Sequence, residues 1–183
     1  RSAILYADEV QPEEPEEEAP DYPVNYFFTQ DGYFKKITPL SLRMGGEQKL
    51  KENDVVIEHI EATNNCDLLF FTDRCQVYKA KGADFADTKA SVLGEYIPAR
   101  LSMEQGESAV FMAVTKDYAG FMVFVFENGK AAKVELSAYA TKTNRKKLIG
   151  AYSDRAPLCA MFAVAEDCEL LLTSSQGRVL LLH

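Results

Sequence analysis

The chain has 183 residues, of which 47% are hydrophobic, and this is enough for a folded domain with one core. Its apolar runs are far shorter than the roughly 20 residues of a membrane-spanning helix, and residues 1–6 lack the apolar core of a secretory signal, so we expect a cytoplasmic protein. The formal net charge of −8 argues against a nucleic-acid partner unless the acidic residues are concentrated in one segment.

The acidic residues are concentrated at the start of the chain. Residues 1–21 hold eight carboxylates and one arginine, so they carry −7 of the total −8 and leave −1 for residues 22–183. The segment repeats proline and glutamate without apolar periodicity, a composition that stays extended. We therefore predict an acidic linker at residues 1–24 and a nearly neutral domain at 25–183. The linker is either a solvated spacer or a shield for a basic surface.

The domain is predicted to consist of repeated β-hairpins. In Asp67–Gly82 an apolar run meets a polar break and then a strand that alternates polar and apolar residues. The same order recurs around Gly32, Cys75, Gly129 and Gly177, which are 43, 54 and 48 residues apart. Repeats of about 40–50 residues with several short strands each are typical of propeller blades.

Each repeat carries further predicted elements in chain order. The first contains a turn-rich segment at 38–46 and a strand at 55–62, and the next two contain strands at 108–114 and 158–164. A propeller unit needs neighbours that cover its faces, so we expect the chain to be part of a longer ring. The units are predicted at residues 25–65, 66–119, 120–167 and 168–183.

The cysteines and histidines do not show the spacing of a zinc site. There is no C-x-x-C pair, and only two histidines could complete a site. We expect Cys66 and Cys168, each just before a strand copy, to be buried or half-buried thiols. His59 lies in a predicted strand and is interpreted as an ordinary strand side chain rather than a pH switch or metal ligand. No catalytic motif of a hydrolase, a nucleotidase or a metalloprotease is present.

Two motifs resemble those of a known family. Leu68–Lys81 reads LLFFTDRCQVYKAK and matches the pattern L-L-F-F-T-x-x-G-x-V-Y-x-x-K, with Cys75 in place of the glycine, while Gly32–Lys35 matches G-Y-x-K. Together with their spacing, they resemble the C-terminal domain of the A subunit of bacterial DNA gyrase and topoisomerase IV, over residues 26–182. The resemblance implies an all-β fold, the β-pinwheel, a propeller-like ring of four-stranded blades that exchange strands with their neighbours. Here it would comprise about three blades and the start of a fourth.

The resemblance also implies a function. The domain would bind and bend duplex DNA without reading its sequence and present it for ATP-dependent strand passage by a type IIA topoisomerase in the bacterial cytoplasm. The strand-cleaving tyrosine and the magnesium site of that family lie outside this domain, so no catalytic residue and no cofactor is expected here, while ATP and magnesium are expected for the parent enzyme. The implied partners are duplex DNA, the rest of the A subunit, and the B subunit that carries the ATPase.

The sequence departs from the gyrase pattern in two places. The gyrase signature Q-R-R-G-G-K-G corresponds to residues 42–48, where Arg43, Gly45 and Gly46 are kept and Glu47 replaces the lysine. Residues 92–95 read VLGE where the family often has A-R-G-R. Both departures remove positive charge, which favours a topoisomerase IV-like or divergent gyrase-like subunit over one that wraps DNA strongly.

A surface that bends DNA needs cations on phosphates along a curved track. If the repeats form a ring, the lysines and arginines in the second strand of each hairpin are expected to lie on one rim of it. Lysines in such strands can also serve only to keep the outer face of a sheet in contact with water. A propeller that binds protein and not DNA is the alternative function, and the salt dependence of DNA affinity separates the two. The predicted DNA-binding residues are Lys35, Lys36, Arg43, Gly45, Gly46, Arg74, Lys79, Lys81, Lys130, Lys133, Lys142, Arg145, Lys146, Lys147 and Arg178.

Overall fold

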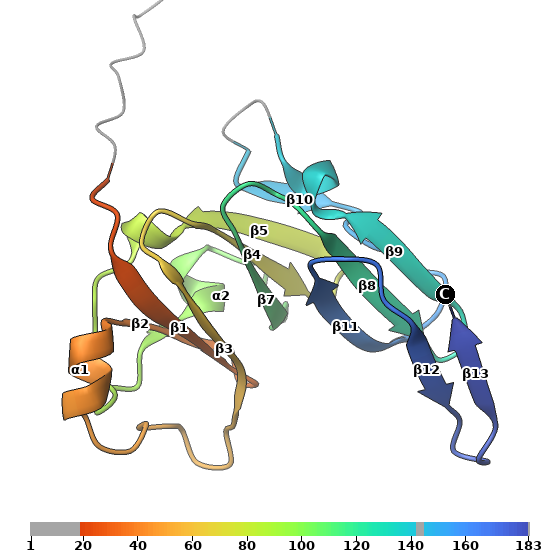
Figure 1. The fold of residues 1–183 in the computed structure, drawn as a ribbon, viewed down its shortest axis with the longest axis horizontal. Coiled ribbons are helices and arrows are strands. Elements are labelled where there is room, and N and C mark those ends of the chain that lie inside the picture. Colours follow the sequence, from red (N-terminus) through yellow and green to blue (C-terminus); the bar gives the residue numbers. More distant parts are fainter. Residues whose placement is uncertain (1–18, 142–144, 183) are drawn as a thin grey trace, which may run out of the picture.

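The structure, a computed structural model, describes residues 19–141 and 145–182. In these residues four small antiparallel sheets follow one another along the chain and lie side by side in an arc (Figure 1). The strand orders are β3-β1-β2-β6, β10-β5-β4-β7, β11-β8-β9 and β12-β13. The predicted all-β architecture of hairpin repeats is confirmed.

The strands are short, and few helical turns connect them. The first sheet contains β1 (Pro23–Thr29), β2 (Tyr33–Ile37), β3 (Val56–Thr63) and β6 (Glu95–Tyr96). The second contains β4 (Asp67–Thr72), β5 (Gln76–Lys81), β7 (Ala109–Thr115) and β10 (Lys147–Ile149). The third contains β8 (Phe121–Phe126), β9 (Ala131–Glu135) and β11 (Leu158–Val164), and the last β12 (Leu170–Thr173) and β13 (Val179–Leu182). The helical turns are α1 (Pro39–Met44), η1 (Gly82–Asp84), α2 (Ile97–Arg100) and η2 (Leu136–Tyr139).

The outer strand of a sheet comes from the next repeat along the chain. In the first sheet β6 pairs with β2 through Tyr33 and Tyr96, and in the second β10 pairs with β5 through Tyr78 and Lys147. The third sheet has only three strands, and within residues 19–141 and 145–182 no strand pairs with the outer edge of β9. At the opposite edge of the second sheet from β10, β7 contacts β3 of the first sheet and β11 of the third. The sheets are therefore blades that exchange strands, as the resemblance implies.

Two apolar clusters lie between neighbouring blades. Successive side chains of a strand point to opposite faces, so Phe70 of β4 packs on Phe28 of the first blade, and Phe71 packs on Phe124 of the third. The central strand is buried on both faces, which explains why its sequence is continuously apolar and does not alternate. The centres of these ring pairs are 5.6 and 5.9 Å apart.

The secondary structure and the burial of the cysteines differ from the predictions at three places. The turn-rich segment 38–46 contains α1, which begins where the Thr38 hydroxyl accepts a hydrogen bond from the Ser41 amide and a proline takes the first helical position. β1 begins at Pro23, inside the span predicted as linker, of which residues 1–18 are outside the described ranges. Cys66 is buried as predicted, but the prediction for Cys168 is wrong: it is exposed, because it precedes the hairpin at the end of the arc.

Candidate nucleic-acid interface

Lys35 is a structural lysine and not a surface cation. It is 2% exposed, and its ammonium group donates hydrogen bonds to the Gln48 side chain and to the carbonyls of Lys49 and Ala90, at 3.0, 2.8 and 3.2 Å. Burial lowers its pKa below the ordinary value of a lysine. The side chain ties β2 to the two loops that follow it, so its ammonium group is out of reach of a phosphate.

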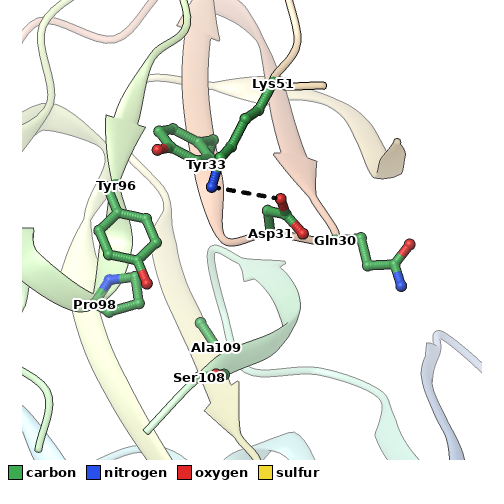
Figure 2. Close-up of a pocket in the computed structure, with 8 residues that line it drawn as sticks. All are labelled: Gln30, Asp31, Tyr33, Lys51, Tyr96, Pro98, Ser108 and Ala109. Carbon is green, nitrogen blue, oxygen red and sulfur yellow. Dashed lines mark ion pairs between the residues drawn. The ribbon is translucent and has the colours of Figure 1, made fainter. Parts of the chain in front are cut away.

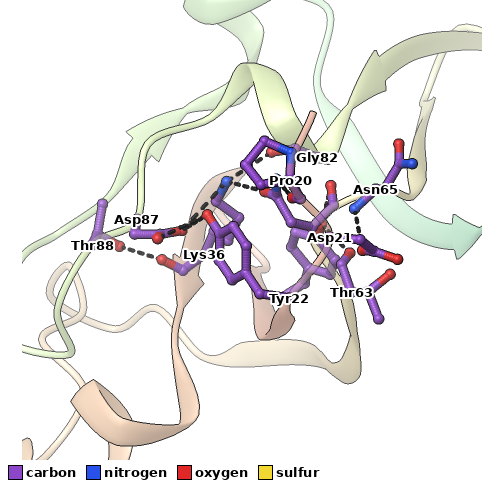
Figure 3. Close-up of polar contacts among 11 residues, drawn as sticks. Pro20, Asp21, Tyr22, Lys36, Thr63, Asn65, Gly82, Asp87 and Thr88 are labelled. Atoms are coloured by element: carbon purple, nitrogen blue, oxygen red, sulfur yellow. Dashed lines mark hydrogen bonds and ion pairs between the residues drawn. The ribbon is translucent and has the colours of Figure 1, made fainter. Parts of the chain in front are cut away.

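Lys36 is buried to the same extent on the other face of β2 (Figure 3). Its ammonium group donates to Asn64 Oδ1 at 2.6 Å and to the Gly82 carbonyl at 3.0 Å, and it lies 3.4 Å from Asp87. The Tyr22 hydroxyl donates to the same Asp87 carboxylate at 2.9 Å. Lys36 therefore joins the first two blades where the chain enters the domain.

In three repeats a lysine lies over an aromatic ring, and each of these lysines is four residues after the turn position Gly32, Cys75 or Gly129. The distances from the ammonium nitrogen to the ring centre are 5.9, 5.2 and 4.7 Å. A ring face attracts a cation, so these contacts hold the lysine against the domain. The pairs are Lys36 with Tyr22, Lys79 with Tyr118, and Lys133 with Phe121.

Like Lys36, the other two of these lysines also contact polar side chains. Lys79 is half-buried and donates to Thr141 Oγ1 at 3.1 Å, and burial lowers its pKa. Lys133 forms an ion pair with Asp167, which lies between the third and fourth blades. The second-strand lysines predicted to form a row of phosphate contacts therefore carry internal partners in three repeats.

Arg74 and Lys147 share one acidic partner. Glu104 lies 3.1 Å from Arg74 Nη1 and 2.6 Å from Lys147 Nζ. The hydrogen bond to Lys147 is the main cause of a lowered Glu104 pKa, and the same bond raises the pKa of Lys147. Sequence reasoning missed Glu104, because nothing in the sequence relates it to an arginine 30 residues earlier and a lysine 43 residues later.

The remaining predicted cations that the structure describes are exposed. In Figure 1, β1, β4, β8 and β12 all run toward the lower right, so their hairpin turns lie on one side of the arc. Lys130 and Arg178 are exposed in two of these turns, and Arg74 lies in a third. Arg145 and Lys146 are exposed just before the outer strand β10, while Lys142 is outside the described residues. Arg43 and Lys81 are exposed in the last turn of α1 and at the end of β5.

Neither of the paired glycines after α1 adopts a left-handed backbone conformation. Gly45 has a φ of −80°, and Gly46 has no φ in the left-handed range. A Cβ at Gly45 would lie 3.0 Å from the Ser41 carbonyl, so the chain needs a small residue there for close approach. Gly46 has open space around it.

A polar hollow of about 500 Å³ opens between the first two blades (Figure 2). The rings of Tyr33 and Tyr96 are 5.2 Å apart on one wall, and Lys51 lies 4.0 Å from Asp31 on another. None of the predicted DNA-binding residues that the structure describes lines it. Its lining consists of Gln30, Asp31, Tyr33, Lys51, Tyr96, Pro98, Ser108 and Ala109.

The described residues give no sign of a metal site. No group of three His, Cys, Asp or Glu side chains within 19–141 and 145–182 could hold a metal ion. The His59 ring shares a hydrogen bond of 2.8 Å with Asn25 and stacks on Phe27, as an ordinary strand side chain.

The described part of the chain also has no helix that is long and apolar enough to cross a membrane.

Comparison with known proteins identifies relatives along most of the chain. No family model matches it. The sequence is 28% identical over 167 residues to the A subunit of DNA gyrase from Streptomyces coelicolor, an alignment that covers 82% of this chain and 19% of that protein. It is 26% identical over 125 residues to the A subunit of DNA topoisomerase 4 from Staphylococcus aureus, with 66% and 16% covered. Its homologues are A subunits of DNA gyrase and topoisomerase IV. The chain spans about a fifth of the length of these relatives.

Solved structures give the same fold. The C-terminal domain of a DNA topoisomerase IV superposes with a TM-score of 0.73 at 23% identity, covering 88% of this chain and 52% of that one. The C-terminal domain of Escherichia coli ParC gives 0.65 at 15% identity over 87% of this chain and 64% of that one, and that of gyrase A gives 0.53. The predicted β-pinwheel and the resemblance to this family are confirmed.

Proposed function

We propose that the chain is the DNA-binding and DNA-bending domain of a type IIA topoisomerase, belonging to its A subunit. The observation that carries the proposal is the pinwheel fold shared with the C-terminal domain of topoisomerase IV over 88% of the chain. Similarity to gyrase and topoisomerase IV A subunits over most of its length supports the same conclusion. The parent protein would be a bacterial cytoplasmic enzyme.

The proposed contacts are cations on phosphates, without reading of base edges. Bending 20–30 base pairs costs roughly 1–6 kcal/mol, so several phosphate contacts are needed to offset it. We assign these contacts to the exposed cations in the hairpin turns, before the outer strand of the second blade, in the last turn of α1 and at the end of β5, and we leave out Lys35 and Lys36 because they are buried. The track consists of Arg43, Lys81, Lys130, Arg145, Lys146 and Arg178, together with Lys142.

The domain is proposed to be topoisomerase IV-like or a divergent gyrase-like form. At the positions of the gyrase signature, Met44 stands where that signature has an arginine, and its side chain is 81% exposed. Glu47 is exposed where the signature has a lysine. Only Arg43 carries positive charge there, so this loop would hold DNA weakly and would not wrap it tightly.

The rest of the enzyme is expected to supply the chemistry. In this proposal the domain presents a DNA segment to a cleavage core elsewhere in the same subunit. The B subunit, with ATP and magnesium, works outside the domain. The residues of this chain bind and orient DNA and carry no step of strand cleavage.

A protein-binding propeller is the second candidate, and one observation favours it. Several basic residues already have acidic partners, among them Lys36, Lys116, Lys133 and Lys147, and residues 22–183 are nearly neutral. Such a surface has less positive charge available for phosphates than a count of lysines suggests.

The two candidates differ in how affinity depends on salt. We expect a 40-base-pair duplex to bind the 183-residue chain with an affinity that falls steeply between 50 and 200 mM salt, by a logarithmic slope of about 0.9 per phosphate contact. A duplex of the same length and different sequence should bind equally well. Absence of binding at 50 mM salt, or an affinity that does not change with salt, would favour the protein-binding propeller.

A further inference from the structure

The carboxylate of Glu104 lies between two cations from different repeats. Its Oε2 atom is 3.1 Å from Arg74 Nη1, in the β4–β5 turn, and its Oε1 atom is 2.6 Å from Lys147 Nζ, at the start of β10. Each carboxylate oxygen therefore faces one cation. This is also the arrangement in which two non-bridging oxygens of a phosphate group would be held.

The arginine is fixed independently of Glu104. Arg74 Nη2 donates to the carbonyl of Gln105 at 2.7 Å, so its guanidinium group keeps one contact with the turn if the carboxylate leaves. The ammonium group of Lys147 lies 5.5 Å from the centre of the Tyr78 ring, which provides a second attraction for it. Both cations would therefore stay near their present positions without Glu104.

A buried carboxylate holds the backbone of the turn that carries Glu104. Glu107 is 4% exposed and accepts hydrogen bonds from the Tyr78 hydroxyl, from Thr72 Oγ1 and from the Glu104 amide. The Glu104 side chain, in contrast, is 49% exposed, and among the described residues its carboxylate is held by the two cations. The backbone of Glu104 is fixed, while its side chain can rotate away.

We propose that Arg74 and Lys147 form a binding site for a backbone phosphate of duplex DNA, and that the Glu104 carboxylate occupies this site when DNA is absent. This inference rests on the proposed function and adds to it a carboxylate of the same chain that competes with the DNA phosphate for the two cations. The side chains of Arg74, Glu104 and Lys147 are 42, 49 and 33% exposed, so a phosphate can reach them from solvent. Exposed ion pairs contribute little free energy, and a phosphate can therefore displace the carboxylate.

The test is a comparison of two substitutions that remove the same charge. Glu104→Gln keeps the size of the side chain and releases both cations. Asp21→Asn is the matched control, because Asp21 forms an ion pair of similar length, 2.7 Å, with Lys116. Glu104 precedes β7 and Lys116 follows it, so the two pairs lie at opposite ends of the same strand.

We expect Glu104→Gln to bind a 40-base-pair duplex about three- to tenfold more tightly than the unmodified chain at 100 mM salt. The reason is that a phosphate no longer has to break two exposed ion pairs to reach Arg74 and Lys147. Asp21→Asn should change the affinity by less than about twofold, through net charge alone. Adding Arg74→Gln and Lys147→Gln to Glu104→Gln should abolish the gain. Thermal unfolding of each variant checks that the fold is kept.

The outcomes separate this inference from the proposed function. If the unmodified chain binds DNA and Glu104→Gln binds no more tightly than Asp21→Asn, the Arg74–Lys147 site is overturned and the proposed function stands. A gain that survives the loss of Arg74 and Lys147 also overturns the site. If neither the unmodified chain nor Glu104→Gln binds DNA, both proposals are contradicted.

Discussion

Phe70 and Phe71 are neighbours in β4, yet they pack in different apolar clusters. Phe70 contacts Phe28 of the first blade, and Phe71 contacts Phe124 of the third. Both side chains are fully buried. The central strand of the second blade thus joins the two clusters and couples the stability of three blades.

This coupling gives the first prediction. Replacing Phe71 with alanine should lower the free energy of unfolding by about 3–5 kcal/mol, because the cavity between the second and third blades would not collapse fully. Urea denaturation followed by far-ultraviolet circular dichroism measures it. Phe121→Ala, at a half-buried ring of the third blade, should have a smaller effect. Equal losses at the two positions would argue against this core.

The second prediction concerns a close approach between the first two blades. A Cβ at Gly82 would overlap the Tyr26 hydroxyl and lie 2.8 Å from the Asn64 carbonyl. Gly82→Ala should therefore lower the free energy of unfolding by about 1–3 kcal/mol. Gly46→Ala is the control, since nothing lies within 4 Å of its Cβ, and it should leave stability unchanged or raise it by less than about 1 kcal/mol. A Gly82→Ala variant with the same free energy of unfolding as the unmodified chain would contradict this packing.

The third prediction separates structural lysines from surface ones. Lys36→Met should lower the free energy of unfolding by about 1–3 kcal/mol, because Asn64 Oδ1 and the Gly82 carbonyl lose their donor inside the domain. Lys130→Gln, at an exposed turn, should change it by less than about 0.5 kcal/mol and should weaken DNA binding instead. Denaturant titration and a DNA-binding assay on the same preparations would show whether the two effects separate in this way.

The fourth prediction is a loss of stability at alkaline pH. Burial raises the pKa of Tyr26, Tyr118, Tyr139 and Tyr152 well above the ordinary value of 10.0. Above pH 10 these phenols ionise in the unfolded chain but stay protonated in the folded one, so the folded state binds more protons and stability falls as pH rises. Below pH 10 this contribution is fully present.

Denaturant unfolding at pH 8, 10 and 11 measures this fall, and absorbance at 295 nm follows tyrosine ionisation. Tyr139→Phe should cost about 1 kcal/mol at pH 8, because the hydroxyl donates to the Ala151 carbonyl at 2.8 Å, and should make the alkaline fall less steep. An unchanged slope for this variant would show that the Tyr139 phenol ionises normally in the folded state.

The sequence predicts the hairpins but not how the blades are completed. Turn residues and period-two alternation mark β4 and β5, whereas β6 and β10 are two and three residues long and carry no pattern of their own. Their partners lie in the preceding repeat, and pairing at that distance is set by tertiary packing. The start of α1 does have a local signal, a threonine before a proline, although the paired glycines that follow indicate a turn.

The candidate interface is predicted only in part for a related reason. A lysine after a hairpin turn looks the same in the sequence whether its ammonium group reaches solvent, as at Lys130, or a buried carbonyl, as at Lys36. The groups that decide between these cases, Asn64 and Gly82 for Lys36, lie 28 and 46 residues further along the chain. Cys75 also limits what the sequence can predict. It adopts a left-handed φ of 57° at the turn position where the other three repeats have glycine. The four turns therefore share a backbone conformation although the residue type differs.

The salt dependence of DNA affinity in a charge-deleted variant tests the central claim most directly. Lys130, Arg145, Lys146 and Arg178 are exposed and would be replaced together by glutamine, with circular dichroism as a check on the fold. If they contact phosphates, the slope of log affinity against log salt should fall by about 3 to 4, at 0.9 per lost contact. A slope equal to that of the unmodified chain would contradict a phosphate track that runs through these four residues.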